Sequence, residues 1–440
     1  MRQTGSRTEQ LAAARARYIP RGLASSMGGF SHRAEGSTVF DVDGREYIDF
    51  AAGISVLNVG HRHPRVQAAI AAQLELLVHP AAQVMMPEVY VELAQRLCEV
   101  APGSHDKKAL VVNTGVEAIE NAVKIARSHT GRPALVSFHN SFHGRTLMGM
   151  SLTGRAEPYK QGFGPFAPEV YQVPYPYPYR WPGGSEACSD QALDGLVELF
   201  RTTVPAEQVA AVVIEPVQGE GGFVVPPADF LPRLLDLCHE NGILLVADEV
   251  QTGLGRTGKM WAVEHTGVVP DLITIAKSLG GGMPIGAVVG TAEVMDAPGP
   301  GGLGGTYAGN ALACAAALAV LDVVAEENLS ARAMVIGETV RGRLELWAAE
   351  MESIGEVRGL GAMIAIELVT SRATRSPAKA LTADVLHRAH AAGLILLKAG
   401  LQDNVIRLLM PLTIDEATLA RGLQVLEAAL RGAVADAAPA

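Results

Sequence analysis

Short apolar runs alternate with longer amphipathic segments through the middle of this chain, and this alternation limits the possible folds more than any other feature. The runs cover residues 109–113, 134–138, 209–215, 243–248, 272–276 and 285–290. Apolar runs of this length are typical of strands that are buried on both faces. Strands that alternate with helices form a mostly parallel sheet covered by helices. We therefore expect an α/β fold that binds its ligand beyond the carboxyl ends of the strands.

Two of the runs end in an ionisable residue. Asp248 closes the run Gly242–Asp248, and Lys277 closes the run Asp271–Lys277. A buried charge is costly unless it is paired, and neither run contains a partner. Pyridoxal phosphate would satisfy both residues, because its ring nitrogen pairs with a carboxylate and its aldehyde forms a Schiff base with a lysine. For either residue alone, the alternative is a solvated position in a loop.

The segments that follow two other runs could complete such a site. Thr114-Gly115-Val116-Glu117 precedes a helical pattern at 117–129 and has the Thr-x-x-Glu spacing of a capping box. The free N–H groups at a helix start bind phosphate, although an ordinary helix start has the same pattern. After the run 134–138, an aromatic ring and a guanidinium follow in Phe142-His143-Gly144-Arg145. The ring could stack on a flat cofactor and the guanidinium could bind a carboxylate, but a surface arginine is the alternative.

Three more charged residues occur in unusual settings. Glu215 and Glu220 lie in a glycine-rich loop at the end of the run 209–215. Arg407 is surrounded by apolar residues in the segment 405–410, so it requires an anion. A substrate carboxylate would serve, and so would an internal salt bridge without a role in binding.

Composition limits the kind of partner. With 48% apolar and 19% charged residues the chain is an ordinary globular protein, and its net charge of -10 without a basic stripe argues against nucleic acid. The longest apolar stretch, 311–324, is too short to span a bilayer and is expected to be a buried helix. Four scattered cysteines fit reduced thiols better than disulfides or a metal site. We expect a cytoplasmic protein that binds small molecules, without a membrane segment or a metal.

The flanking regions predict a smaller α+β unit after residue 330. We expect helices at 331–350 and 382–392, strands at 361–368, 394–398 and 405–410, and a last helix that begins with a capping box at Thr413. A hairpin with an Asp43-Gly44 turn is expected at 39–49, and Tyr171–Pro182 should form an extended surface loop. Residues 1–10 and 434–440 are interpreted as frayed ends. We divide the chain into an N-terminal segment that packs with the small domain, a large domain and a C-terminal small domain, at 1–65, 66–330 and 331–440.

Six segments resemble class III aminotransferases, which are pyridoxal phosphate enzymes of fold type I. They are Ala51–His61, Glu117–Arg127, Ile214–Phe223, Ala247–Gly253, Gly304–Asn310 and Gly359–Glu367. The resemblance runs from about Arg21 to about Arg431 and is closest to 4-aminobutyrate aminotransferases. It implies a large domain with a mostly parallel seven-stranded sheet, a small α+β domain, and a homodimer or homotetramer with a shared active site.

The resemblance also implies roles for single residues. Lys277 would be the Schiff-base lysine and proton carrier, Asp248 would pair with the ring nitrogen, and Gln251 would reach the phenolic oxygen of the cofactor. The remaining cofactor contacts would come from Thr114, Gly115, Val116, Phe142 or His143, and Thr306 of a second subunit. The substrate contacts would come from Ile54, Arg145, Glu215, Glu220 and Arg407. Val116 departs from the Ser or Ala that is usual in the family, so we expect weaker retention of the cofactor.

Glu220 and Arg407 resemble a pair that lets one site accept two different substrates. Glu220 would neutralise Arg407 while an amine donor binds, and the α-carboxylate of glutamate or 2-oxoglutarate would displace it. The resemblance thus implies transamination of 4-aminobutyrate with 2-oxoglutarate to succinate semialdehyde and glutamate. Alternatives within the family are 5-aminovalerate or another ω-amino acid, ornithine or acetylornithine as the donor, and an amino-acid isomerase. A regulator that binds the cofactor without turnover is the alternative from another class.

Overall fold

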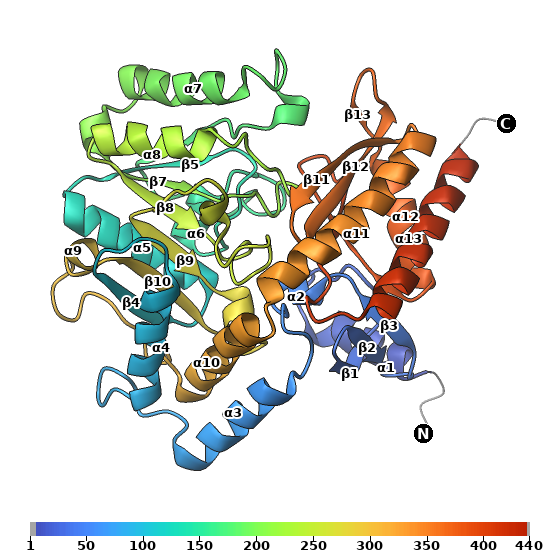
Figure 1. The fold of residues 1–440 in the computed structure, drawn as a ribbon, viewed down its shortest axis with the longest axis horizontal. Coiled ribbons are helices and arrows are strands. Elements are labelled where there is room, and N and C mark those ends of the chain that lie inside the picture. Colours follow the sequence, from blue (N-terminus) through green and yellow to red (C-terminus); the bar gives the residue numbers. More distant parts are fainter. Residues whose placement is uncertain (1–5, 438–440) are drawn as a thin grey trace.

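The computed structural model describes residues 6–437, and its large domain is built on one seven-stranded sheet (Figure 1). The order is β4-β10-β9-β8-β7-β5-β6, and within the described residues only β10 runs antiparallel to its neighbours. The strands are β4 (Lys107–Val112), β5 (Ala134–Phe138), β6 (Val170–Val173), β7 (Val209–Ile214), β8 (Leu244–Asp248), β9 (Leu272–Ile275) and β10 (Gly286–Thr291). The predicted mostly parallel sheet is confirmed.

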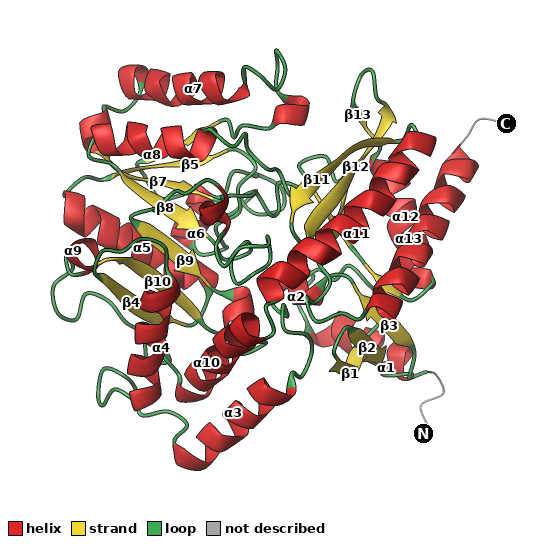
Figure 2. Ribbon diagram, viewed as in Figure 1, coloured by secondary structure: helices red, strands yellow, loops and turns green. Residues whose placement is uncertain are grey.

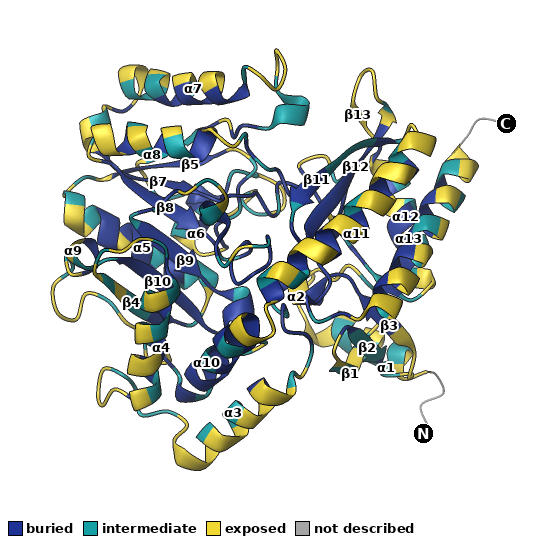
Figure 3. Ribbon diagram, in the orientation of Figure 1, coloured by how far each residue is buried: buried dark blue, intermediate teal, exposed yellow. Residues whose placement is uncertain are grey.

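Helices cover both faces of this sheet, as Figure 2 shows. The helices of this domain are α3 (Pro64–Leu76), α4 (Glu88–Val100), α5 (Gly115–Thr130), α6 (Leu147–Leu152), α7 (Cys188–Thr202), α8 (Phe230–Glu240), α9 (Ala292–Met295) and α10 (Ala311–Glu326). Alternate residues of β8 point to opposite layers: Leu245 and Ala247 pack with α4, α7, α8 and α10, and Leu244 and Val246 pack with α5. Figure 3 shows the result, a buried sheet between helices with exposed outer faces.

Helix α10 is the buried helix that the apolar stretch 311–324 predicts. Most of its residues are buried, because it packs against α3, α4 and α11 (Leu329–Glu350) within the protein. Across residues 6–437, each helix is too short or too polar to cross a lipid bilayer.

The small domain is an antiparallel sheet with three long helices, and the N-terminal segment joins it. Its strands run in the order β11 (Ile354–Leu360), β12 (Met363–Ser371), β16 (Val405–Leu408) and β15 (Leu397–Ala399), with β13 (Ser376–Pro377) beside β12. Its helices are α11 (Leu329–Glu350), α12 (Lys379–Ala391) and α13 (Glu416–Ala437). The N-terminal segment contains α1 (Arg7–Tyr18), β1 (Ser31–Glu35), β2 (Thr38–Asp41), β3 (Glu46–Asp49) and α2 (Ala52–Ser55).

Strand β14 (Leu394–Ile395) connects these two parts, because it pairs in parallel with β3. The predicted hairpin at 39–49 is confirmed, and Gly44 has the positive φ that its turn requires. The domain limits at residues 65 and 330 stay a prediction.

Several predicted boundaries were wrong for local reasons. The strand predicted at 361–368 instead begins after a turn at Gly361, and β11 precedes that turn. The run 394–398 divides between two sheets. The last helix is capped by Asp415, whose carboxylate accepts the Thr418 N–H at 2.9 Å, and not by Thr413.

The chain ends also differ from the prediction. Residues 7–10 are helical, because Ser6 and Glu9 form a capping box at the start of α1. Residues 434–437 belong to α13, and residues 1–5 and 438–440 lie outside the described residues.

The Tyr- and Pro-rich stretch Tyr171–Pro182 is not the surface loop that its prolines predict. It begins inside β6, and the buried Tyr175 donates a hydrogen bond to the Glu215 carbonyl oxygen at 3.0 Å. Further along, Tyr177 and Arg180 bind the Glu367 carboxylate of β12 in the small domain. The stretch therefore connects the two domains.

Candidate active site

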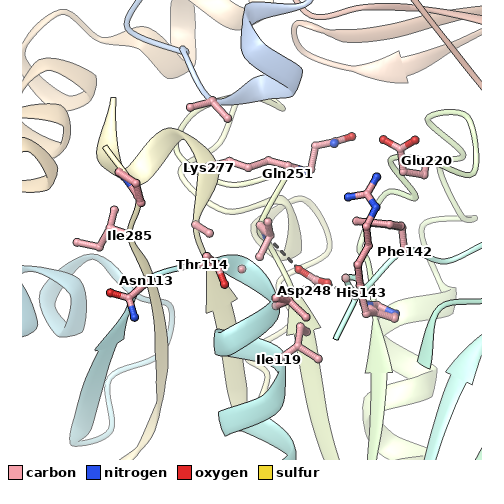
Figure 4. A pocket seen from close by; sticks show the side chains of 18 of the residues that line it. Asn113, Thr114, Ile119, Phe142, His143, Glu220, Asp248, Gln251, Lys277 and Ile285 are labelled. Atoms are coloured by element: carbon pink, nitrogen blue, oxygen red, sulfur yellow. Dashed lines mark hydrogen bonds and ion pairs between the residues drawn. The ribbon is translucent and has the colours of Figure 1, made fainter. Parts of the chain in front are cut away.

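A cavity of about 440 Å³ lies at the carboxyl ends of the large-domain strands. Most of the residues predicted for a site line it, and Figure 4 shows them converging from separate segments. These are Thr114, Gly115, Val116, Phe142, His143, Arg145, Glu215, Glu220, Asp248, Gln251 and Lys277. They meet because the carboxyl ends of neighbouring parallel strands share one edge of the sheet.

Asp248 ends β8 and is buried, but it has protein partners that the sequence did not reveal. One carboxylate oxygen is 2.7 Å from Nδ1 of His143, and the other accepts hydrogen bonds from Thr274 Oγ1 at 3.1 Å and Val250 N at 3.2 Å. A carboxylate can accept about four hydrogen bonds, so one position remains for a ligand. All three protein partners lie outside the run Gly242–Asp248, which contains no partner of its own.

His143 is fully buried beside this carboxylate. Burial lowers the pKa of the imidazole, but the hydrogen bond and the charge of Asp248 outweigh it, so the pKa of His143 is raised. Its Nε2 atom is buried and has no hydrogen-bond partner within residues 6–437. His143 thus contacts Asp248 through its ring edge. Phe142 is the second aromatic residue of this segment that lines the cavity.

Lys277 follows β9 by two residues, in the first position of a short 3-10 turn (Lys277–Gly280). Its φ of 45° lies in the left-handed region, which non-glycine residues rarely adopt and which is frequent at functional sites. Burial lowers the pKa of its amine and outweighs the opposing charges of Glu220, Asp248 and Glu215. In Figure 4 the side chain lies above Asp248, and none of the described carboxylates forms an ion pair with it. A lowered pKa leaves more of the amine in its neutral, nucleophilic form.

One corner of the cavity suits a phosphate. Helix α5 begins at Gly115, and the N–H groups of Gly115 and Val116 have no partner in the described part of the chain. The predicted capping box is only half formed, because Thr114 accepts the Glu117 N–H while the Glu117 carboxylate accepts the Asn113 N–H at 2.7 Å. Two free N–H groups at the positive end of a helix form an anion site.

The side chain of Val116 packs against two glycines of the segment that carries Arg145. A Cβ on Gly144 would lie 2.1 Å from Val116 Cγ2, and one on Gly149 would lie 2.6 Å from the same atom. Larger residues than glycine would therefore clash with the valine. Val116 has no hydroxyl that could bind a phosphate, and its side chain instead packs on the backbone of these two glycines.

Glu215 and Gln251 place polar groups deep in the cavity. The Glu215 carboxylate accepts hydrogen bonds from the N–H groups of Phe142 and Gly219, each at 3.0 Å, and burial raises its pKa to about 7. Oε1 of Gln251 is buried and has no hydrogen-bond partner among the described residues. A Cβ on Gly219 would lie 2.2 Å from that oxygen, so the glycine provides the space that Gln251 occupies.

Two arginines lie in different settings at the mouth of the cavity. Arg145 is exposed, and its guanidinium carbon is 5.0 Å from the ring centre of Phe142 and 5.2 Å from that of Tyr159. None of the ion pairs found within residues 6–437 involves it. Arg407 is buried and donates to the Glu220 carboxylate at 2.5 Å. Burial raises the pKa of Glu220, but the charge of Arg407 outweighs it, so the pKa is lowered.

Three predicted site residues do not line the cavity. Arg407 reaches it only through Glu220. Ile54 is 43% exposed, and Thr306 is exposed in the loop before α10. In a single chain neither of these two contacts the cavity.

Some cavity residues were not predicted. They are Val56, Asn113, Ile119, Val250, Ala276 and Gly282–Ile285, together with Thr274 and Tyr159 just behind the lining. Thr274 left a signal, because it is the polar residue inside the apolar run that ends at Lys277. No set of three or more acidic, histidine or cysteine side chains that could hold a metal ion is found within residues 6–437.

Glu249, next to Asp248, provides a test of the electrostatics outside the cavity. It is buried, accepts the Val263 N–H at 2.9 Å, and burial raises its pKa from 4.5 to about 7. The folded protein then holds this proton more tightly than the unfolded chain, so stability is lost as the pH rises from about 4.5 to about 7. We expect Glu249→Gln to remove a penalty in the free energy of unfolding on the order of 3 kcal/mol at pH values above that range. Thermal unfolding at pH 5 and pH 8 measures this; a variant with the pH dependence of the parent would contradict it.

The arrangement fits the chemical groups of pyridoxal phosphate. Free N–H groups could bind a phosphate, a carboxylate has one open position for a ring nitrogen, and an amine of lowered pKa could bind an aldehyde. These are Gly115 and Val116, Asp248 and Lys277, and Gln251 adds an amide whose oxygen has no partner among the described residues. The phenolic oxygen of the cofactor would suit that amide.

Comparison with known proteins gives the same result. The family model described as aminotransferase class-III matches residues 22–430. The chain is 50% identical to a probable 4-aminobutyrate aminotransferase of Bacillus subtilis, over 96% of this chain and 98% of the relative. It is 49% identical to a 5-aminovalerate aminotransferase of Pseudomonas aeruginosa, over 95% of this chain and 97% of the relative.

A solved structure agrees with the fold. An amine transaminase from an uncultivated Pseudomonas species, bound to pyridoxal phosphate, superposes with a TM-score of 0.87 at 33% identity. The match covers 94% of this chain and 99% of that one. The chain therefore belongs to the class III aminotransferases and is a pyridoxal phosphate-dependent aminotransferase of fold type I.

Proposed function

We propose that this protein transfers the amino group of 4-aminobutyrate to 2-oxoglutarate and produces succinate semialdehyde and glutamate. The observation that carries the proposal is the contrast between two guanidinium groups beside one cavity. Arg145 has no acidic partner among the described residues, whereas Arg407 is neutralised by Glu220. The similarity to 4-aminobutyrate aminotransferases supports the same substrate.

Several residues would serve the cofactor. Bound pyridoxal phosphate supplies an aldehyde that condenses with amines and a ring that accepts the electrons left when a C–H bond is broken. Lys277 would bind that aldehyde carbon between turnovers and carry the proton during them, since burial favours its neutral amine. Asp248 would keep the ring nitrogen protonated, with its carboxylate oriented by His143 and Thr274. Phe142 would pack beside the ring.

The two arginines would bind the two substrates in turn. The single carboxylate of 4-aminobutyrate would bind Arg145 while the ion pair with Glu220 compensates the charge of Arg407. Glutamate and 2-oxoglutarate carry a second carboxylate next to the reacting carbon, and that group would displace the Glu220 side chain from Arg407. The same cavity then accepts two shapes, and the reaction should proceed by a ping-pong scheme.

Replacement of Arg145 tests the donor. We expect Arg145→Ala to raise the KM for 4-aminobutyrate by about 100-fold, the loss expected for a charge-assisted pair with a carboxylate. The control is n-butylamine, which has a methyl group in place of the carboxylate and whose kcat/KM should not change. An unchanged KM for 4-aminobutyrate would remove Arg145 from the substrate site.

A longer donor is the second candidate, because a relative of 49% identity is a 5-aminovalerate aminotransferase. The two donors differ by one methylene group, which a pocket discriminates by only about 10–200-fold. The values of kcat/KM for 4-aminobutyrate and 5-aminovalerate, measured on the wild-type protein, decide between them.

We further propose that the active enzyme is a homodimer or a larger assembly whose subunits share their sites. Exposed apolar side chains gather in the segment 74–86, and the ring of His79 stacks on Tyr307 at 5.0 Å, which joins this segment to the loop that carries Thr306. Gln83 also donates a hydrogen bond to the Gly305 carbonyl oxygen at 2.9 Å. A cluster of exposed apolar side chains is typical of a subunit interface.

Mixed dimers test whether Thr306 acts across that interface. Lys277→Ala subunits and Thr306→Ala subunits are each impaired, but a mixed dimer contains one site with both residues intact if Thr306 serves the neighbouring subunit. We expect mixing to restore tight cofactor binding and turnover at one of the two sites of each mixed dimer. No recovery on mixing would place Thr306 within its own subunit or outside the site.

A further inference from the structure

The loop that carries Glu220 lies against one face of the small-domain sheet. Residues 217–223 pack on that face through Val217 and Phe223, which contact Met363, Ala365 and Val405. On the same face, Arg358 of β11 and Arg407 of β16 are both register partners of Ala365 on β12. Directly paired residues of neighbouring strands project to the same side of a sheet. The two arginines therefore form one row that faces the loop.

The two arginines bind different parts of the loop. Arg407 binds the Glu220 side chain, whereas Arg358 Nε donates to the main-chain oxygen of Gly222 at 2.8 Å. Gly400 N donates to the main-chain oxygen of Glu220 at 3.0 Å. A Cβ on Gly222 would lie 3.0 Å from Arg358 Nη2, so the guanidinium is in close contact with the loop backbone. Main chain and side chain of the loop are thus held separately.

Arg358 itself is held by a buried network of charges. It donates to the Glu367 carboxylate at 2.6 Å and to that of Glu356 at 2.5 Å, and Glu367 is completely buried. Tyr177 and Arg180, from the stretch that joins the domains, bind the same Glu367 carboxylate. Buried ion networks are costly to form and contribute little to stability over apolar packing. The transamination scheme does not use any of these groups.

We propose that Arg358 is a positioning residue that fixes the main chain of the Glu220 loop, so that only the Glu220 side chain moves when the substrates alternate. The inference rests on the proposed exchange between Glu220 and a substrate carboxylate. With the main chain fixed, Glu220 returns to Arg407 after each dicarboxylate leaves. With the main chain loosened, Glu220 neutralises the charge of Arg407 less completely. The uncompensated charge then disfavours binding of 4-aminobutyrate, which places no carboxylate near Arg407. It does not disfavour 2-oxoglutarate, whose carboxylate pairs with Arg407.

Arg358→Lys is the first test, because lysine keeps the charge opposite Glu367 but loses the planar fork that reaches Gly222. Single-turnover rates of the two half-reactions are measured separately on the holoenzyme. For each substrate, the measured quantity is the single-turnover rate constant divided by the dissociation constant. We expect this ratio to fall about tenfold for 4-aminobutyrate, the effect of losing one hydrogen bond from a charged donor. For 2-oxoglutarate it should stay within about threefold. A general loss of folding would lower both values together.

Hydrogen exchange gives a readout that does not depend on the substrate. The amides of residues 215–224 should exchange faster in Arg358→Lys than in the wild-type protein. Arg180→Gln is the matched control, since it removes a cation from Glu367 but does not contact the loop, and it should change neither the exchange nor the ratio of the half-reactions. If Arg358→Lys does not fold, Glu356→Gln removes one partner of Arg358 and should shift both readouts in the same direction.

Three results would overturn the proposal: equal losses in both half-reactions, unchanged exchange in the loop, or the same shifts in Arg180→Gln. Failure of the proposed function is a different result. In that case the wild-type protein itself would not convert 4-aminobutyrate, whereas loop exchange would still respond to Arg358→Lys.

Discussion

Replacement of Lys277 by alanine should abolish turnover, with kcat lowered at least ~10³-fold. The loss combines two functions of one amine, covalent attachment of the cofactor and proton transfer at the substrate carbon, and proton transfer alone is worth about 10²–10⁴-fold. The position of Lys277 in the cavity lining and the lowered pKa of its amine are the observations behind this expectation. Initial rates with 4-aminobutyrate and 2-oxoglutarate measure the effect.

Mass spectrometry separates the two functions. After borohydride reduction, the wild-type peptide that contains Lys277 should carry the mass of the cofactor, and the variant should carry none. Lys259→Ala, an exposed lysine outside the cavity, is the matched control and should behave as the wild type. Near-normal turnover in Lys277→Ala would show that the assignment is wrong.

The second large effect is expected for Asp248→Asn. Asparagine has the same shape but no charge, so it cannot hold a proton on a ring nitrogen. The substitution also removes the charged partner of His143, which is buried and whose pKa is raised by Asp248. We expect kcat to fall by about 10³-fold, the upper range for loss of one electrostatic group at a reacting centre. Measured kcat values test this, and a rate within tenfold of the wild type would contradict it.

Thr274→Val is the control for Asp248. It removes one hydrogen bond to the Asp248 carboxylate, but it keeps the charge of Asp248 and the shape of the side chain at position 274. Its expected effect is about tenfold or less. If it were as damaging as Asp248→Asn, the geometry of the carboxylate and not its charge would be decisive.

The sequence predicted the parts of the site that depend on strand ends. Asp248, Glu215 and Lys277 each close a short apolar run whose length and composition predict a strand, and parallel strands bring their carboxyl ends together. Such residues can be located without knowing the order of the strands in the sheet. The family resemblance added Gln251, which reaches the cavity from the loop after β8.

Contacts between distant segments could not be predicted in this way. His143 and Asp248 are 105 positions apart, and no periodic pattern connects them. The partners of the Tyr- and Pro-rich stretch were missed because prolines exclude helix but do not indicate whether tyrosines face solvent or a carboxylate. The packing of Val116 between Gly144 and Gly149 depends on a close approach that only coordinates show.

The pairing of β3 with β14 has a consequence for how the chain is made. The edge of the N-terminal sheet is completed by Leu394 and Ile395, which leave the ribosome long after Glu46–Asp49. The central sheet draws its strands from residues 107–291 and can assemble earlier, because every one of its partners has then been synthesised. The first fifty residues must wait with an unpaired edge until translation is nearly complete, a period in which a chaperone or a neighbouring nascent chain can occupy that edge.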